Sequence, residues 1–147
     1  MPLLDRKKSF LNTMKQYSGA VEFATAANRD GPIGGQLAMR HFLDSGFKPT
    51  AVIAVNDFMA FGVLKELRGS GLRVPGDVSV TGYDNIRLSE FVYPPLTTVN
   101  IPRAEIGHTA FQALVPSGDE VNTNGREFRI NPELVIRETT GPAPRSR

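Results

Sequence analysis

The 147-residue sequence contains no cysteine, and it also lacks long apolar runs. The absence of cysteine excludes disulfides, thiolate nucleophiles and zinc sites with thiolate ligands. No apolar run approaches the roughly 20 residues that a membrane-spanning helix requires. The first residues, MPLLDRKKSF, lack the basic segment and apolar stretch of a secretory signal. We therefore expect a cytoplasmic protein with no membrane partner.

An excess of charge of one sign is also missing. Seventeen Lys and Arg residues stand against fifteen Asp and Glu residues, and Arg6-Lys7-Lys8 is the only basic run. This balance indicates no nucleic-acid-binding surface on the chain itself. With 40% hydrophobic and 22% charged residues, the composition is typical of one globular domain.

Familiar catalytic motifs are absent as well. The sequence contains no G-x-S-x-G elbow, no H-E-x-x-H pair and no P-loop. His41 and His108 lie within helical patterns, and neither has a plausible nucleophile beside it. We therefore expect no enzyme, no cofactor and no metal. The remaining enzyme alternative uses Asp84 as a base with His108 or Asp57.

The patterns that are present alternate between strand and helix. Helical periodicity occurs over 5–17, 30–45 and 58–69, and strand patterns occur over 20–25, 50–55 and 78–82. This order predicts an α/β fold: a parallel sheet with right-handed crossovers and helices on both faces. The apolar run at 50–55 predicts a strand buried on both faces, and Asp57 is the predicted N-cap of the next helix.

The pattern changes after Pro94-Pro95. An extended segment is predicted over 96–101, a helix over 102–114, and two short strands within 127–137 around Asn131-Pro132. The helix presents an apolar set on one side: Ile106, Ala110, Phe111 and Leu114. Such a patch without a partner in the chain favours association or disorder.

Polar side chains follow three of the predicted strands, at Asn56, Asp84 and the loop that ends at Asp30. Ligands bind beyond the carboxyl ends of parallel strands. Asp84 fits an ionised acceptor for ligand hydroxyls or N–H groups, or equally a turn residue satisfied by its own backbone. Asn56 offers a donor and an acceptor, which suits a sugar hydroxyl or a base edge.

Arg6 lies at the start of the first helix, where the helix dipole disfavours a cation. This position hints at a binding role. The alternative is a solvated basic face shared with Lys7 and Lys8.

Several motifs occur together and in order. They are VND at 55–57, LRVPGDVS at 72–79, GYD at 82–84 and PPLTT at 94–98, with RKKSF at 6–10 and PELVIRETT ending at Thr140. In this combination the chain closely resembles the effector-binding domain of the LacI/GalR family of bacterial transcription regulators. The likeness covers nearly the whole chain.

The resemblance implies a fold of two α/β lobes joined by three crossing segments, with the effector in the cleft and closure coupled to DNA affinity. It implies that Asp84 grips effector hydroxyls or base nitrogens, that Asn56 makes a polar contact and that Arg6 anchors the effector. Asp30 falls where the family usually has an aromatic that stacks on the ligand, so that contact differs here.

The resemblance also divides the chain. Residues 1–96 and 132–140 correspond to the carboxyl-terminal lobe, 97–131 to a crossover strand and helix of the other lobe, and 141–147 to a disordered tail. The segments 58–69 and 88–94 are expected to contribute to a homodimer interface. The family's helix-turn-helix and most of its amino-terminal lobe have no counterpart in these residues, so operator DNA would be bound only through a helix-turn-helix outside them.

The expected function is therefore binding of a small polar effector, most simply a sugar, within a transcription regulator. A periplasmic sugar-binding protein with the same fold is the alternative.

Overall fold

The computed structural model describes residues 2–17, 31–115 and 127–143. Its helices are α1 (Pro2–Met14), α2 (Gly31–Asp44), α3 (Asp57–Gly69) and α4 (Arg103–Leu114), with a 3-10 turn, η1, at Arg87–Glu90. Its strands are β1 (Ala51–Ile53), β2 (Ser79–Thr81), β3 (Thr98–Asn100) and β4 (Glu133–Val135). This order confirms the predicted α/β class. The predicted strand at 20–25 lies outside the described residues.

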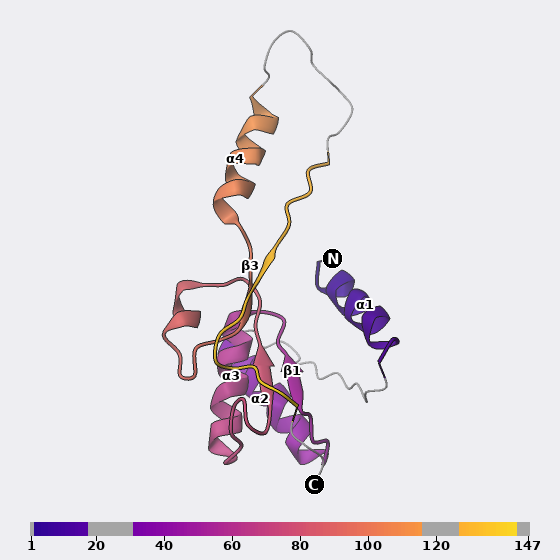
Figure 1. The fold of residues 1–147 in the computed structure, drawn as a ribbon, viewed down its shortest axis with the longest axis vertical. Coiled ribbons are helices and arrows are strands. Elements are labelled where there is room, and N and C mark those ends of the chain that lie inside the picture. Colours follow the sequence, from indigo (N-terminus) through magenta and orange to yellow (C-terminus); the bar gives the residue numbers. More distant parts are fainter. Residues whose placement is uncertain (1, 18–30, 116–126, 144–147) are drawn as a thin grey trace.

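The body of the molecule consists of one parallel strand pair and two helices. β1 pairs with β2 in parallel, with Val52 opposite Val80, and α3 is the crossover between them. α2 packs against α3 beside this pair (Figure 1). The helix predicted over 58–69 is confirmed as α3, and its apolar residues are buried in one core with residues of α2, β2 and the adjoining segments: Met39, Ala60, Val63, Leu64, Leu67, Val78, Val80 and Leu96.

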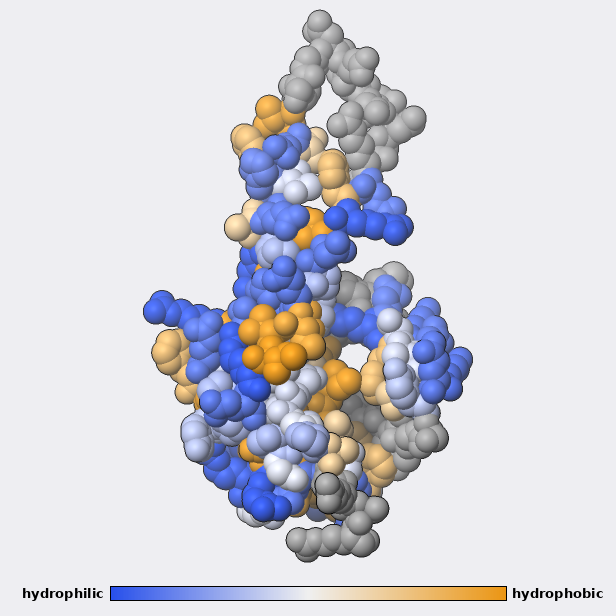
Figure 2. All heavy atoms as spheres, viewed as in Figure 1, coloured by the Kyte–Doolittle hydropathy of each residue, from blue (hydrophilic) through white to orange (hydrophobic). Residues whose placement is uncertain are grey.

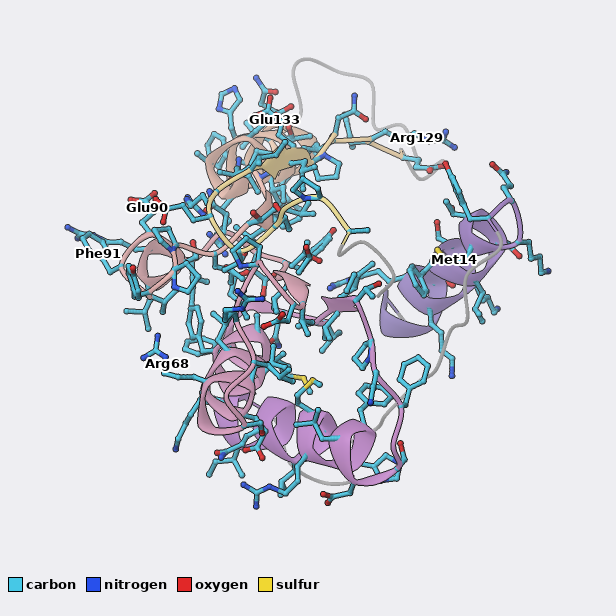
Figure 3. All side chains as sticks on the ribbon, turned by 60° about the horizontal axis from the view of Figure 1, so that its bottom comes forward. Met14, Arg68, Glu90, Phe91, Arg129 and Glu133 are labelled. Atoms are coloured by element: carbon cyan, nitrogen blue, oxygen red, sulfur yellow. The ribbon has the colours of Figure 1, made fainter. Side chains whose placement is uncertain are left out.

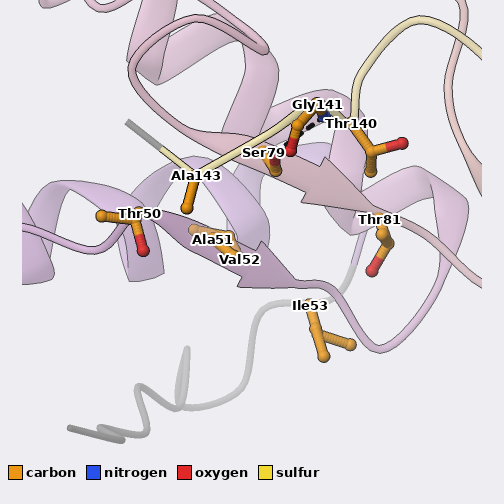
Figure 4. A pocket seen from close by; sticks show the side chains of 9 residues that line it. All are labelled: Thr50, Ala51, Val52, Ile53, Ser79, Thr81, Thr140, Gly141 and Ala143. Carbon is orange, nitrogen blue, oxygen red and sulfur yellow. Dashed lines mark hydrogen bonds between the residues drawn. The ribbon is translucent and has the colours of Figure 1, made fainter. Parts of the chain in front are cut away.

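The prediction that β1 is buried on both faces is wrong for the part of the chain that the structure describes. Side chains alternate along a strand, so Val52 faces the helices while Ala51 and Ile53 face away, and Ile53 is 62% exposed. That side of the sheet forms an open hollow of about 320 Å³, lined by β1, Ser79, Thr81 and the segment 140–143 (Figure 4). The apolar run at 50–55 therefore shows that both faces of β1 could be buried. In the described residues only one of them is.

A second, smaller sheet leads away from the body. β3 pairs antiparallel with β4 and continues into α4, which stands apart from α2 and α3 (Figure 1). Of the two strands predicted within 127–137, the described residues form one, β4, which pairs with Thr98–Asn100. α4 buries none of its residues, and Phe111 and Leu114 are 65% and 80% exposed.

The predicted tail at 141–147 begins at the edge of the body. Gly141 N donates a hydrogen bond to Ser79 Oγ at 3.2 Å, while residues 144–147 lie outside the described part. None of the described helices is both long and apolar enough to cross a bilayer.

A buried carboxylate joins α2 to α3. Glu66 accepts hydrogen bonds from Arg40 Nε and from Gln36 Nε2, each at 2.8 Å. These bonds, that of Arg40 first, lower the pKa of Glu66 below its ordinary value. The helix pair is therefore tied by an ionised group that is 8% exposed.

Glu66→Gln is expected to lower the free energy of unfolding at neutral pH by about 1 kcal/mol. Because the folded-state pKa of Glu66 is depressed, its contribution is fully present above the unfolded value near 4.5 and is lost as the pH falls through the folded value. Urea unfolding at neutral pH and in acid measures this. An equal loss at both pH values would show that the charge of Glu66 contributes nothing.

Candidate functional site

The site lies where β1 and β2 end. Beyond the two strands, Ala54 N donates to Thr81 O and Asp57 N donates to Tyr83 O, both at 2.9 Å. These backbone bonds hold the residues after β1 beside the residues after β2. The parallel pairing of β1 with β2 thus places the ends of the two strands side by side.

Gly82 allows this close approach. A Cβ atom built on Gly82 would lie 2.3 Å from Asp57 Oδ1 and 2.8 Å from Leu96 Cδ2. No side chain fits between these atoms. A glycine immediately before Tyr83-Asp84 is thus required by packing.

Asp84 occupies an unusual backbone position at the tip of β2. Its φ is 110° and that of Asn85 is 48°, values that L-residues adopt rarely. The backbone N–H of Asp84 donates to Val99 O at 2.9 Å, which fixes the turn against β3. The turn is therefore held by the main chain, and the carboxylate accepts no hydrogen bond from any residue within 2–17, 31–115 and 127–143.

The surroundings of Asp84 affect its pKa in opposite directions. Partial burial, followed by the negative charge of Asp57, raises the pKa of Asp84 above its ordinary value, while Arg6 and Arg103 act to lower it. None of the ion pairs among the described residues includes Asp84. A half-buried carboxylate that is repelled and unpaired is typical of a functional site.

The cap of α3 differs from the prediction by one residue. Asn56, with an extended φ of −154°, is the N-cap, and its Oδ1 accepts a hydrogen bond from Met59 N at 2.8 Å. The predicted N-cap, Asp57, is instead the first residue of the helix. Since the oxygen of Asn56 is engaged, its amide N–H groups are the part able to serve a ligand.

Asp57 is fully buried and holds the site loop in place. Its carboxylate accepts from Ile86 N at 2.8 Å and from Thr98 Oγ1 at 2.5 Å. The first bond fixes the loop after Asp84, and the second fixes β3. Both carboxylate oxygens are therefore engaged in structure, which leaves Asp84 as the carboxylate able to meet a ligand.

Arg6 reaches the strand tips from α1. Its Nη1 donates to Val55 O at 2.8 Å, and its guanidinium carbon lies 3.9 Å from the centre of the Tyr83 ring. This contact is a cation–π interaction. Arg6 thus contacts the two strand tips and does not simply extend into solvent. Asp30, the fourth predicted site residue, lies outside the described residues.

Two arginines at the site were missed by sequence reasoning. Arg103, at the start of α4, donates from Nη2 to Asp84 O at 2.7 Å. Arg137 donates to Asn85 Oδ1 at 2.9 Å and to Ser89 Oγ at 3.1 Å. A charged residue within the apolar run LVIRETT was the one available signal for Arg137.

The hollow on the open side of the sheet is a separate feature. Its lining includes none of Asp84, Asn56 and Arg6 (Figure 4). Within the described residues, no group of three His, Cys, Asp or Glu side chains is arranged to hold a metal ion. The described residues at the strand tips can therefore bind a ligand through hydrogen bonds and charge interactions.

Comparisons with known proteins agree with this architecture. A family model described as a periplasmic binding protein-like domain matches residues 4–140. The transcriptional repressor PurR of Vibrio vulnificus is 46% identical over 92 residues, which are 63% of this chain and 28% of that protein. The chain thus spans less than a third of the length of this curated relative.

Solved structures of LacI-family regulators are also similar. The regulator from Enterococcus faecium with bound ribose has a TM-score of 0.80 and 29% identity, over 95% of this chain and 52% of that one. The regulator from Arthrobacter sp. FB24 in complex with lactose has a TM-score of 0.77 and 30% identity, over 91% of this chain and 50% of that one. The likeness therefore covers nearly all of this chain and about half of each neighbour.

Proposed function

Because the chain belongs to the family of periplasmic binding protein-like domains, we propose that it carries half of the effector cleft of a LacI/GalR-type transcription regulator. The effector is a small polar molecule, most simply a sugar. The ribose and lactose bound by the two neighbouring structures support this class of ligand. The protein acts by binding and not by catalysis.

This proposal rests on the environment of the Asp84 carboxylate. Its carboxylate is half-buried, lacks a partner among the described residues and has a raised pKa at the strand tips. In the proposed complex Asp84 accepts hydrogen bonds from ligand hydroxyls, Asn56 donates from its amide, and Arg6 donates to an oxygen-rich edge. Asp30 is assigned to the same site as a polar contact.

Half of a cleft binds weakly, because a two-lobe site encloses its ligand from both sides. We expect a Kd in the millimolar range or weaker, which corresponds to about 4 kcal/mol. NMR titration of the chain with a panel of sugars and nucleobases suits such affinities. Amide shifts centred on residues 55–57 and 83–85 are expected. Shifts confined to the hollow lined by 50–53 and 140–143 would refute the site.

We also propose the lobe division and the homodimer. Residues 1–96 and 132–140 form the carboxyl-terminal lobe, and 97–131 cross into the other lobe, where the exposed apolar side of α4 meets its partners. The dimer surface comprises 58–69 and 88–94. Phe91 and Tyr93 are 69% and 78% exposed, and Phe91 lies on the side of the molecule away from Met14 of α1 (Figure 3).

Tyr93→Asp is expected to shift the chain toward monomer, because it places a charge in an apolar contact. A roughly tenfold or greater rise in the dimer Kd, corresponding to at least about 1.4 kcal/mol, would be measured by sedimentation velocity. Leu134→Asp provides a matched control, since Leu134 is also exposed but lies on β4, outside the assigned surface. Exposed apolar side chains are visible on the face drawn in Figure 2. An equal effect of both substitutions would contradict the assigned surface.

A periplasmic sugar-binding protein remains the second candidate, since its cleft would use the same strand tips. The complete gene distinguishes the two. A helix-turn-helix upstream supports the regulator, which would bind DNA through that segment in the cytoplasm. A secretory leader upstream would support the alternative.

A further inference from the structure

Two guanidinium groups stand beside Asp84 without a carboxylate partner among the described residues. From this arrangement we infer that the effector is a hydroxylated small molecule with one anionic group, such as a sugar acid or sugar phosphate, and that Arg103 selects it. The inference rests on the proposed effector site. It adds that the ligand is negatively charged and that Arg103 recognises this charge.

The partners of the arginines separate two groups. Arg40, Arg73, Arg129 and Arg137 each contact a carboxylate, of Glu66, Asp77, Glu127 and Glu90 respectively. Arg6 and Arg103 instead donate to the carbonyl oxygens of Val55 and Asp84, at the strand tips. Arg68, in the last turn of α3, also donates to a backbone carbonyl, that of Tyr93, but not to a residue of the strand tips. Since a carbonyl is neutral, it orients the side chains of Arg6 and Arg103 without cancelling their charge.

The two guanidinium groups come to the site from different elements. Arg6 projects from α1, with its guanidinium over the Tyr83 ring, and Arg103 projects from the first residue of α4. Arg103 is bonded to the backbone of Asp84 itself, and Arg6 lies over the ring of the residue before it; both act to lower the pKa of Asp84. The strand tips therefore combine one acidic acceptor with two cationic donors.

The donors available match an oxyanion. A guanidinium has five N–H groups, and Arg6 and Arg103 each use one of them in a hydrogen bond to a residue of the described chain. The remaining groups can form paired bonds to a carboxylate or phosphate. Asn56 and Asp84 then serve the hydroxyls. A ligand without hydroxyls would bring its negative charge to Asp84 with no compensating bond.

The test compares aldoses with their 6-phosphates and aldonic acids, using the chain 1–147 and NMR titration. We expect at least one anionic member to bind about tenfold more tightly than its neutral parent, as one charge-assisted contact allows. Arg103→Gln should reduce this preference, taken as the ratio of the two affinities measured on the same variant, to about twofold or less. Arg87→Gln is the matched control, because Arg87 is exposed on η1 and has no hydrogen-bonded partner in the described ranges.

The outcomes distinguish the two proposals. Neutral sugars that bind at 55–57 and 83–85 with no anionic preference would overturn this inference and leave the effector site standing. A preference that survives Arg103→Gln, or that Arg87→Gln also removes, would overturn the role of Arg103. Inorganic phosphate alone binding as tightly as the sugar phosphates would reveal a simple anion site. No binding by either class would overturn both proposals.

Discussion

Gly62→Ala is expected to lower the free energy of unfolding by about 3 kcal/mol or more. A Cβ atom at Gly62 would lie 1.8 Å from Pro32 O, and one at Gly35 would lie 1.9 Å from Met59 O. Both obstacles are backbone carbonyls, so no side-chain rotation can relieve them. α2 and α3 would have to move apart, which would open the core around Met39 and Leu67.

Gly69→Ala is the control in the same helix. A Cβ atom at Gly69 meets nothing within 4 Å, so alanine should be neutral or stabilise the protein by up to about 1 kcal/mol through helix propensity. Urea denaturation of both variants measures the difference. Similar stabilities for Gly62→Ala and Gly69→Ala would contradict the close packing of α2 on α3.

The same packing positions the site. α3 begins at Asp57, directly after its cap Asn56, and Asp57 holds the loop that carries Asp84 through Ile86 N. A displaced α3 would therefore also displace the strand tips. Ligand binding should be lost in Gly62→Ala together with stability.

Asp84→Asn is expected to change stability and binding in opposite directions. Ligand affinity should fall about tenfold to hundredfold, because a charged acceptor is lost from hydrogen bonds worth roughly 1.5–3 kcal/mol. Stability at neutral pH should rise, because a half-buried carboxylate repelled by Asp57 is removed. Asparagine tolerates positive φ, so the backbone at position 84 can be retained.

The pH dependence gives the sign of the stability effect. The folded-state pKa of Asp84 is raised above its ordinary value of 3.8. Its contribution to stability is therefore most favourable below the unfolded pKa and is lost as the pH rises through the folded pKa. Thermal unfolding should find the gain from Asp84→Asn at neutral pH and not in acid below 3.8.

Asp44→Asn controls for the removal of a carboxylate, because Asp44 is exposed at the end of α2. It should leave binding unchanged. If Asp84→Asn lowers stability at neutral pH and leaves binding intact, Asp84 is a structural turn residue. Such a result would favour the turn alternative that the sequence allows.

Local patterns in the sequence were sufficient for the architecture. The order of strand and helix signals depends on nearest neighbours along the chain, and it predicted the α/β class and the helix that α3 confirms. The identity of the N-cap did not follow, because Asn56 and Asp57 are both good caps and burial of Asp57 against Ile86 and Thr98 decides between them.

Contacts between distant segments could not be read from the sequence. Arg103 is 19 residues from Asp84, to which it binds, and Arg137 is 52 residues from Asn85. Neither position has a periodic signal that reveals its partner. The exposed side of β1 was equally hidden, since an apolar strand looks the same whether or not its second face is covered.

The central claim is that the carboxylate of Asp84 accepts hydrogen bonds from the bound effector. The most direct test follows the Asp84 carboxyl carbon by ¹³C NMR as the pH is varied, with and without a saturating ligand from the titration panel. The claim predicts a pKa above 3.8 in the free protein and a lower pKa in the complex, because hydrogen bonds to the ionised form favour it. The same pKa with and without ligand would contradict the claim.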